Sequence, residues 1–107
     1  MATIDDFKKL EIRIGTIMSA EKILEGDKLL KLVVDFGTET RQVMSGIAEQ
    51  FSDPATLVGR QAPFITNLEP RKLRGYERNG MILATDDAAG IVLIHPDHEV
   101  PKGSSVR

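Results

Sequence analysis

Apolar residues recur at every second position in several short runs of this chain, and this pattern constrains the fold more than any other feature. The clearest run covers Leu30, Leu32, Val34 and Phe36. Such alternation is typical of a half-buried β-strand, because successive strand side chains point to opposite faces. The residues 37–39 provide a turn into a second run at 40–45, which predicts a β-hairpin.

Further strands are predicted at 12–17, extending towards residue 23, and at 63–68, 81–85 and 91–95. Gly15 lies inside the first of these and indicates a bulge or a sharp coil of the sheet. A short helix is predicted at 46–51, ended by Ser52, Asp53 and Pro54. About five strands with one helix after the third favour a small all-β Greek-key barrel over a sandwich, which needs about seven.

Both ends of the chain are predicted to pack on this barrel or beside it. The residues 4–10 carry an apolar side chain at every third position with charged residues between, like one short amphipathic helix, which we expect to lie against the barrel. The tail at 96–107 contains two prolines, and we expect it to pack on a partner subunit.

Length and composition indicate an ordinary globular domain. The chain has 107 residues, enough for one domain, and 41% of them are hydrophobic. It has no cysteine, which excludes disulfides, thiolate zinc sites and cysteine nucleophiles and fits a cytoplasmic protein. No apolar run approaches the roughly 20 residues of a membrane span, so no membrane partner is expected.

Charge is unevenly distributed along the chain. The net charge is −2, which by itself argues against a nucleic-acid partner. Residues 60–79 nevertheless hold five basic and two acidic side chains, a local net charge of +3. A polyanion would therefore meet one positive region on an otherwise negative body, and local potential governs such encounters. The charged residues of this segment are Arg60, Glu69, Arg71, Lys72, Arg74, Glu77 and Arg78.

We expect the basic part of the segment 67–81 to be a loop between two strands, and the segment also carries a motif. It reads NLEPRKLRGYERNGM, which resembles the pattern NLxPxKLRGxExxGM of the tRNA-binding domain family. The resemblance continues elsewhere, with residues 7–15 similar to the family's opening strand, 27–37 to its second strand, and 41–48 to its third strand and helix start. The family includes the C-terminal domain of bacterial methionyl-tRNA synthetases, free-standing beta subunits and stand-alone tRNA-binding proteins.

This resemblance implies a single tRNA-binding OB-fold domain over 1–107, a five-stranded Greek-key barrel with short helices and a C-terminal extension. It implies a non-catalytic homodimer that binds the outside corner of tRNA with little regard to sequence, needs no cofactor, and has methionyl-tRNA synthetase as a further partner. The residues expected at the RNA are Lys31, Arg41, Asn67, Lys72, Arg74, Arg78 and Met81.

Two positions depart from the family pattern. Arg78 stands where the family usually has serine, so any contact through that hydroxyl is lost and a phosphate contact is expected instead. Tyr76 replaces a small aliphatic residue, and either packs against the loop or stacks on a base.

Two other functions compete with tRNA binding. The opening 4–7, the residues 15–17 and the tail at 95–97 are similar to the CsaA-type secretion-related chaperones, which lack the LRGxExxGM run. An enzyme would have to use His95 and His98, the only histidines. Two histidines without a third ligand make a poor metal site, and nothing places a base beside Ser45, so no metal and no catalytic residue are expected.

Overall fold

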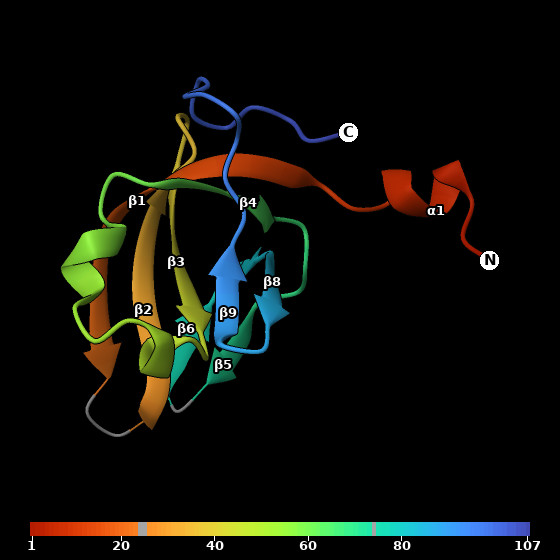
Figure 1. Cartoon of the computed structure of the whole chain (residues 1–107). Helices are drawn as coiled ribbons and strands as arrows, with labels where there is room; N and C mark the ends of the chain where they lie inside the picture. Colours follow the sequence, from red (N-terminus) through yellow and green to blue (C-terminus); the bar gives the residue numbers. More distant parts are fainter. Residues whose placement is uncertain (24–25, 74) are drawn as a thin grey trace.

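The computed structural model describes residues 1–23, 26–73 and 75–107 (Figure 1). Strands dominate the fold, and only short helical segments interrupt them. The elements in chain order are α1 (Ile4–Lys8), β1 (Ile12–Ile23), β2 (Gly26–Asp35), β3 (Thr40–Ser45), η1 (Ala48–Gln50), η2 (Pro54–Leu57), β4 (Gln61–Ile65), β5 (Arg71–Leu73), β6 (Tyr76–Arg78), β7 (Met81–Ile82), β8 (Ala84–Asp87) and β9 (Gly90–Leu93).

Five strands form one antiparallel sheet in the order β3-β2-β1-β4-β7. The sheet depends on β1, a strand of 12 residues whose first half pairs with β4 and whose second half pairs with β2. The sheet curls, so that β3 and β7 contact each other from opposite ends of this order (Figure 1). This arrangement confirms the predicted all-β, OB-type fold.

The core lies inside the curl. Leu30, Leu32, Val34 and Phe36 are all buried, as their alternation predicted. Phe36 packs edge-on against Phe64 of β4, with ring centroids 5.5 Å apart and planes at 88°. Edge-to-face pairs of this kind add to the stabilisation that burial alone provides. The buried side chains of the segment 30–36 therefore meet those of β4 at the centre of the barrel.

Gly15 does not mark a bulge, which was one of its two predicted roles. It pairs regularly with Ala62 of β4, and the register shifts of β1 lie instead between Ile17 and Ser19 and between Lys22 and Ile23. A Cβ at Gly15 would overlap the side chain of Val34 and lie 2.7 Å from the ring of Phe36. Glycine is thus required here by the close packing of the core and not by a bulge.

The short helix predicted at 46–51 forms as a single 3₁₀ turn. The segment contains the 3₁₀ turn η1, and a second turn, η2, follows it. Asp53 and Pro54, expected to end a helix, instead begin η2: the Asp53 carboxylate accepts from the amide of Ala55, and Pro54 occupies the first turn. Asp and Pro are both favoured at helix N-termini, which is the signal that the prediction missed. Within the described residues, every helix is too short or too polar to cross a bilayer.

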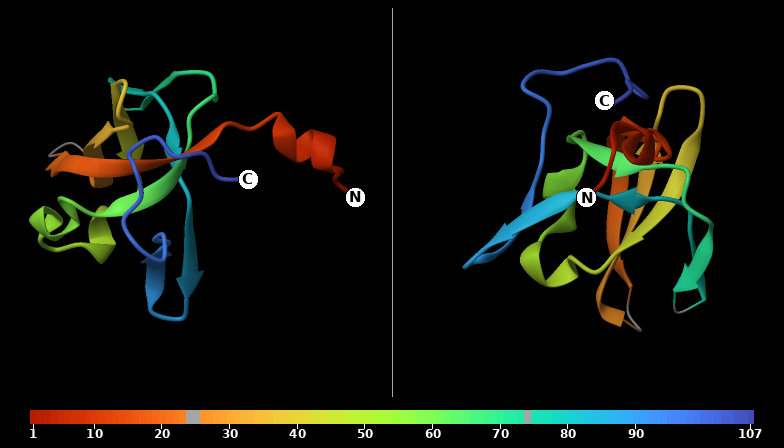
Figure 2. Two further views of the ribbon diagram at one scale, coloured as in Figure 1. Left: turned by 90° about the horizontal axis from the view of Figure 1, so that it is seen from above. Right: turned by 90° about the vertical axis from the view of Figure 1, so that its right-hand side faces the viewer.

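The predicted N-terminal helix forms but does not lie against the barrel. Thr3 and Asp6 make a reciprocal capping box at its start, and none of its residues is buried. Figures 1 and 2 show α1 standing away from the sheet at the end of an extended segment. Ile4 is 65% exposed, and Phe7 and Leu10 are exposed as well. A helix of five residues has little stability of its own, so α1 is left without the packing that normally supports one.

The C-terminal tail packs on its own chain. Its backbone bonds to the first half of β1, with the amide of Gly103 donating to Ile14 at 2.7 Å and the amide of Val106 donating to Ile12 at 2.9 Å. The buried Gln61 side chain fixes the start of the tail, because its amide donates to the carbonyl of Val100 at 2.8 Å and its oxygen accepts from the amide of the same residue at 3.0 Å. The tail thus lies along β1 of its own chain, and the expectation that it packs on a partner subunit remains a prediction.

The second half of the chain is more divided than predicted. The strand expected at 63–68 is β4, which begins two residues earlier and ends at Ile65. The strand expected at 81–85 is two strands: β7 belongs to the main sheet, and β8 forms a separate hairpin with β9. Most importantly, the basic segment expected to be a loop forms a third structure, the hairpin of β5 and β6.

Candidate nucleic-acid interface

The β5–β6 hairpin carries the basic segment outside the main sheet. Its register places Arg71 opposite Arg78, Lys72 opposite Glu77, and residue 73 opposite Tyr76. Gly75 in the connection has φ = 82°, a left-handed conformation that glycine adopts without strain. Because facing residues share one side of a ribbon, Arg71, Tyr76 and Arg78 lie on one face, and Lys72 and Glu77 lie on the other.

Two hydrogen bonds tie the hairpin to β3. The side-chain amide of Gln42 donates to the carbonyl of Glu77 at 3.0 Å, and the backbone amide of Asn79 donates to the carbonyl of Gln42 at 3.0 Å. β6 therefore lies along the free edge of β3. The rigid barrel thus fixes where the basic side chains project.

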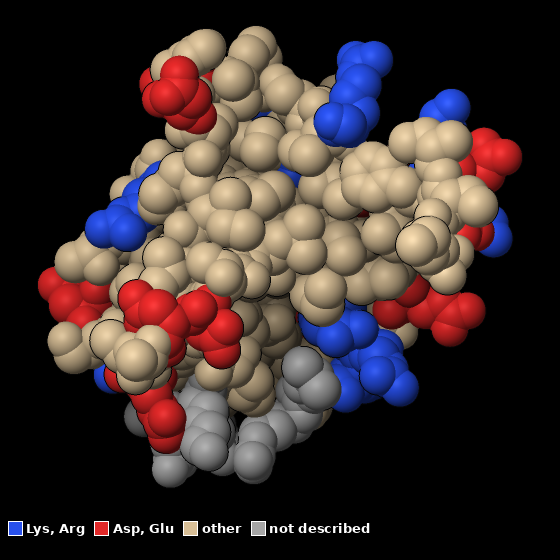
Figure 3. Space-filling model, turned by 45° about the vertical axis from the view of Figure 1, so that its right-hand side comes forward, with Lys and Arg blue, Asp and Glu red and all other residues tan. Residues whose placement is uncertain are grey.

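Arg71 and Lys72 are exposed, and neither forms an ion pair within residues 1–23, 26–73 and 75–107. A shallow hollow of about 260 Å³ is lined by both, together with Pro70 and Glu77. In Figure 3, a group of Lys and Arg side chains lies low on the face shown, beside this hairpin. These cations are available to a ligand in solvent.

Arg78 is half-buried, and its Nε is buried with no hydrogen-bond partner in the part of the chain that the structure describes. A buried donor without a partner is rare in folded proteins. Its position opposite Arg71 brings two like charges together on one face of the hairpin. Both features distinguish Arg78 from the other predicted site residues.

Arg41, by contrast, is held by the protein itself. Its Nε donates to a Glu39 oxygen at 2.8 Å, and its Nη1 donates to the carbonyl of the buried Thr66, leaving the side chain 15% exposed. Arg13 donates to the same carboxylate at 3.1 Å. The hydrogen bonds from Arg41, which have the larger effect, and from Arg13 hold the pKa of Glu39 below its usual range. The predicted RNA contact of Arg41 remains a prediction, but the structure gives Arg41 a structural role.

Asn67 also has internal partners. Its side-chain amide donates to the carbonyl of Lys9 at 2.7 Å, and its side-chain oxygen accepts from the amide of Glu11 at 2.7 Å. It thereby fixes the segment that leads from α1 into β1. Met81, on β7 opposite Ile65, remains partly exposed and free to meet an apolar group.

Lys31 lies on β2 and is paired with Glu21 of β1, with Nζ 2.7 Å from the carboxylate. The hydrogen bond to Glu21 and its charge raise the pKa of Lys31, and Tyr76 adds to the same shift. Arg74, the remaining predicted contact, lies outside the described residues.

The prediction missed residues that the hairpin brings to β3. A hollow of about 320 Å³ lies between β3 and β6 and is lined by Thr40, Arg41, Gln42, Glu77 and Asn79. Amide side chains can donate to and accept from a base or ribose, which makes such a hollow suitable for a nucleotide. Only the contact of β6 with the edge of β3 places these residues together, and a segment predicted as a loop gives no signal of that contact.

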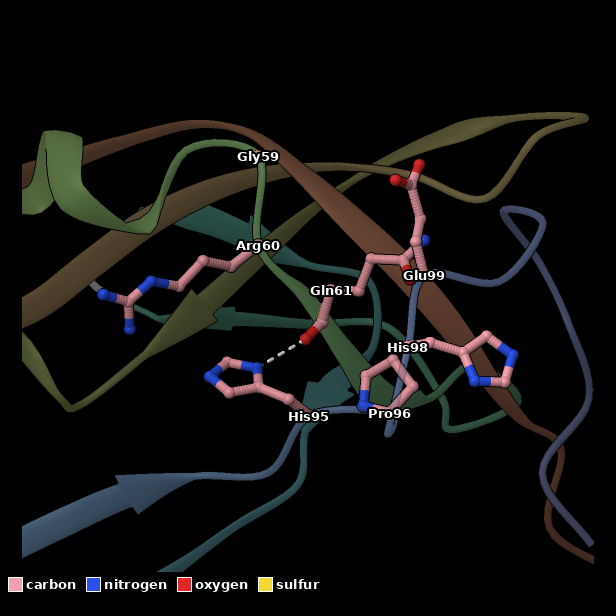
Figure 4. Close-up of a pocket in the computed structure, with 7 residues that line it drawn as sticks. All are labelled: Gly59, Arg60, Gln61, His95, Pro96, His98 and Glu99. Atoms are coloured by element: carbon pink, nitrogen blue, oxygen red, sulfur yellow. Dashed lines mark hydrogen bonds between the residues drawn. The ribbon is translucent and has the colours of Figure 1, made fainter.

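The two histidines belong to a separate hollow of about 360 Å³. A ring nitrogen of His95 is hydrogen-bonded to the carbonyl of Gln61 at 2.7 Å, whereas His98 points in another direction (Figure 4). Among the described residues, no three His, Asp or Glu side chains are grouped as metal ligands would be. The side chains around this hollow do not converge on one point, and they support neither a metal centre nor a catalytic pair.

A curled five-stranded barrel with a cationic hairpin fixed to one edge is a nucleic-acid-binding domain of the OB type. Residues 12–105 match the family described as "Putative tRNA binding domain". The chain belongs to this tRNA-binding domain family. Because the family is a binding domain, its membership supports the predicted non-catalytic role.

Known relatives and structures agree with this assignment. The chain is 50% identical over 103 residues to a methionine–tRNA ligase of Methanothrix thermoacetophila, a match that covers 96% of this chain and 15% of the ligase. It is similar to the solved structure of a MetRS-related protein from Pyrococcus horikoshii, with 39% identity, a TM-score of 0.92, and 100% and 98% of the two chains covered. The chaperone CsaA of Bacillus anthracis is 29% identical, with a TM-score of 0.89 and 100% and 99% covered.

Proposed function

We propose that the chain binds tRNA by shape, with the β5–β6 hairpin as its principal contact. The observation that carries this proposal is the pair Arg71 and Lys72, exposed on a fixed hairpin and unpaired among the described residues. Arg74 and Arg78 add positive charge to the same segment, and Met81 offers an apolar contact beside it. Lys31, Arg41 and Asn67 support the surface around them.

The physical argument for shape recognition comes from RNA geometry. A-form helices hide their base edges in a deep, narrow groove, so proteins read phosphates, 2′-hydroxyls and overall form. A hairpin presenting guanidinium and ammonium groups can bind phosphates on any sequence. Such binding weakens steeply with salt, because each neutralised phosphate releases counterions. We therefore propose little discrimination among tRNAs.

The test compares the double variant Lys72→Ala/Arg74→Ala with the wild type by filter binding at several salt concentrations. We expect weaker binding and a shallower dependence of log K on log salt, by roughly 0.7–0.9 for each lost phosphate contact. The matched control Arg60→Ala/Arg107→Ala likewise removes two positive charges, and both of its residues are exposed and lie outside the hairpin. Equal losses in the two double variants would contradict a site on the hairpin.

We also propose that the chain works as a homodimer with α1 in the interface. Ile4 and Phe7 expose apolar side chains on a helix that has no support from its own barrel. Leu10, just beyond the helix, and Val106 of the tail are exposed as well. A second copy related by a two-fold axis would cover the same residues on both chains. Sedimentation of Phe7→Asp should give a monomer where the wild type gives a dimer, whereas Lys8→Ala on the same helix should not.

Association with methionyl-tRNA synthetase is the remaining part of the proposal. The chain spans about 15% of the length of the methionine–tRNA ligases that it matches. In those ligases a similar segment is part of the same polypeptide, and we propose that this chain assists such an enzyme in the cytoplasm by raising the local concentration of tRNA. Adding the chain to a methionyl-tRNA synthetase that lacks its own matching segment should lower the KM for tRNA with kcat unchanged. An unchanged KM would contradict this association.

The similarity to CsaA supports a second candidate function, binding of unfolded preproteins. Exposed Met18, Val58, Val92 and Ile94 could meet apolar segments of such a client. Fluorescence anisotropy with an unfolded preprotein and with tRNA separates the two functions. Preprotein binding without measurable tRNA binding would favour the chaperone function.

A further inference from the structure

Arg71 and Arg78 form an unusual pair on the β5–β6 hairpin. They are direct cross-strand partners in the antiparallel register, so their side chains leave the same face of the ribbon. Side chains in this relation have Cβ atoms about 5 Å apart, and like charges there are destabilising. Because each strand of the hairpin has only 3 residues, the ribbon has few other interactions to offset this repulsion.

Within the described residues, no carboxylate compensates for the pair. Arg13 and Arg41 each contact Glu39, and Lys31 contacts Glu21, but neither Arg71 nor Arg78 has such a contact. Glu77, the acidic residue of the hairpin, lies on the opposite face across from Lys72. The Arg71–Arg78 face therefore has an excess of positive charge.

The second observation concerns the Nε of Arg78. This atom is buried and makes no hydrogen bond to the described part of the protein, although every guanidinium N–H is a strong donor. A buried donor without an acceptor costs free energy that an incoming acceptor would recover. The repulsion and the unsatisfied donor occur at the same place, and an anion between the two guanidinium groups would relieve both.

We infer that Arg71 and Arg78 clamp one phosphate group between them. To bind the phosphate, the half-buried Arg78 side chain turns outward and donates through Nε and one terminal nitrogen, the edge of the guanidinium that matches two phosphate oxygens. Exposed Arg71 closes the other side. The inference rests on the proposed function in one respect, namely that the phosphate belongs to the backbone of bound RNA. Arg78, which replaces the usual serine of the family motif, would thus provide a contact specific to this chain.

The first experiment tests the clamp without RNA. Arginine Nε–Hε signals of ¹⁵N-labelled protein are recorded during titration with inorganic phosphate, against sodium chloride of equal ionic strength. We expect a saturable shift of the Arg78 signal, assigned with Arg78→Lys, and a smaller shift of the Arg71 signal. Arg60, exposed and outside the hairpin, is the internal control. Equal shifts of all three signals, or no shift at Arg78, would overturn the clamp.

The second experiment asks whether RNA supplies the phosphate. Arg78→Lys keeps the charge and loses the fork, so its tRNA affinity should fall roughly three- to tenfold with the salt slope unchanged, whereas Arg78→Ser should also reduce the slope. Arg60→Lys should bind as the wild type does. If Arg78→Lys binds tRNA as tightly as the wild type does, while free phosphate still shifts the Arg78 signal of the wild type, the phosphate held by the clamp does not come from RNA. If the wild type itself binds no tRNA, the proposed function fails, and the phosphate titration still decides the clamp.

Discussion

The polar residues around the interface belong to two regions that differ in how their charges are used. On the rim of the barrel, Arg41 and Asn67 have their donors bonded to protein carboxylate or carbonyl oxygens. On the β5–β6 hairpin, Arg71 and Lys72 project into solvent without an ion pair among the described residues. One family motif and its surroundings therefore contain residues with opposite physical roles.

The difference shows that a shared motif does not imply a shared contact. Asn67 stands only four positions before Arg71 in the sequence. Its hydrogen bonds nevertheless fix the segment between α1 and β1, which is far from both residues in the sequence. Rim residues should affect stability more than binding, and hairpin residues should affect binding more than stability. Substitutions in the two regions can test this distinction.

The largest effect is expected for Arg41→Ala. The substitution removes the bonds to Glu39 and leaves the carbonyl of buried Thr66 without its charged donor. Hydrogen bonds to charged groups contribute roughly 1.5–3 kcal/mol, and we expect a loss of about that size in the free energy of unfolding. Urea denaturation followed by circular dichroism measures it. If the variant were as stable as the wild type, Arg41 would have no structural role on the rim.

Asn67→Ala should have the next largest effect. It deletes one bond to Lys9 and one to Glu11, each worth about 0.5–1.5 kcal/mol, at a site that is partly open to water. Asn67→Asp is the matched variant, because it keeps the acceptor for Glu11 but cannot donate to Lys9. We expect it to be destabilised as well. Normal stability of both variants combined with weaker tRNA binding would place Asn67 with the hairpin residues instead.

Lys72→Ala should reverse this pattern. The side chain is exposed, so the free energy of unfolding should change by less than about 0.5 kcal/mol. Loss of one phosphate contact should lower tRNA affinity several-fold and reduce the salt slope by roughly 0.7–0.9. Filter binding and urea denaturation on the same preparation measure both quantities. A large loss of stability would show that the hairpin depends on Lys72 for its own structure.

The barrel could be predicted from the sequence because apolar and polar residues alternate locally along its strands. Leu30, Leu32, Val34 and Phe36 needed no partner to identify their common face, and all four are buried. The position of the cationic segment in the chain could be predicted for the same reason, since it depends only on composition. The resemblance to the family led to the prediction of the OB fold and of RNA as the ligand. The match over 12–105 confirms the family.

Features that depend on contacts distant in sequence could not be predicted. The structural role of Asn67 depends on its hydrogen bond to Lys9, more than fifty residues away in the sequence. Arg71 faces Arg78 only because of the register of a hairpin, in a segment that was predicted to be a loop. The burial of Gly15 against Phe36 likewise depends on how two strands curl together. Local pattern contains no information on such pairings, because the same residues suit several registers.

The smallest effect expected is the pH dependence that Glu39 gives to the rim. Its pKa is lowered by the hydrogen bonds from Arg41 and Arg13, so the folded state binds this proton less readily than the unfolded state does. The resulting stabilisation is fully present above the ordinary value of 4.5 and is lost as the pH falls through the lowered value. Glu39→Gln lacks this contribution, so the difference between the urea midpoints of wild type and variant should shrink between about pH 6 and pH 3. A difference that stays constant over this range would show that the rim charges do not stabilise the barrel through Glu39.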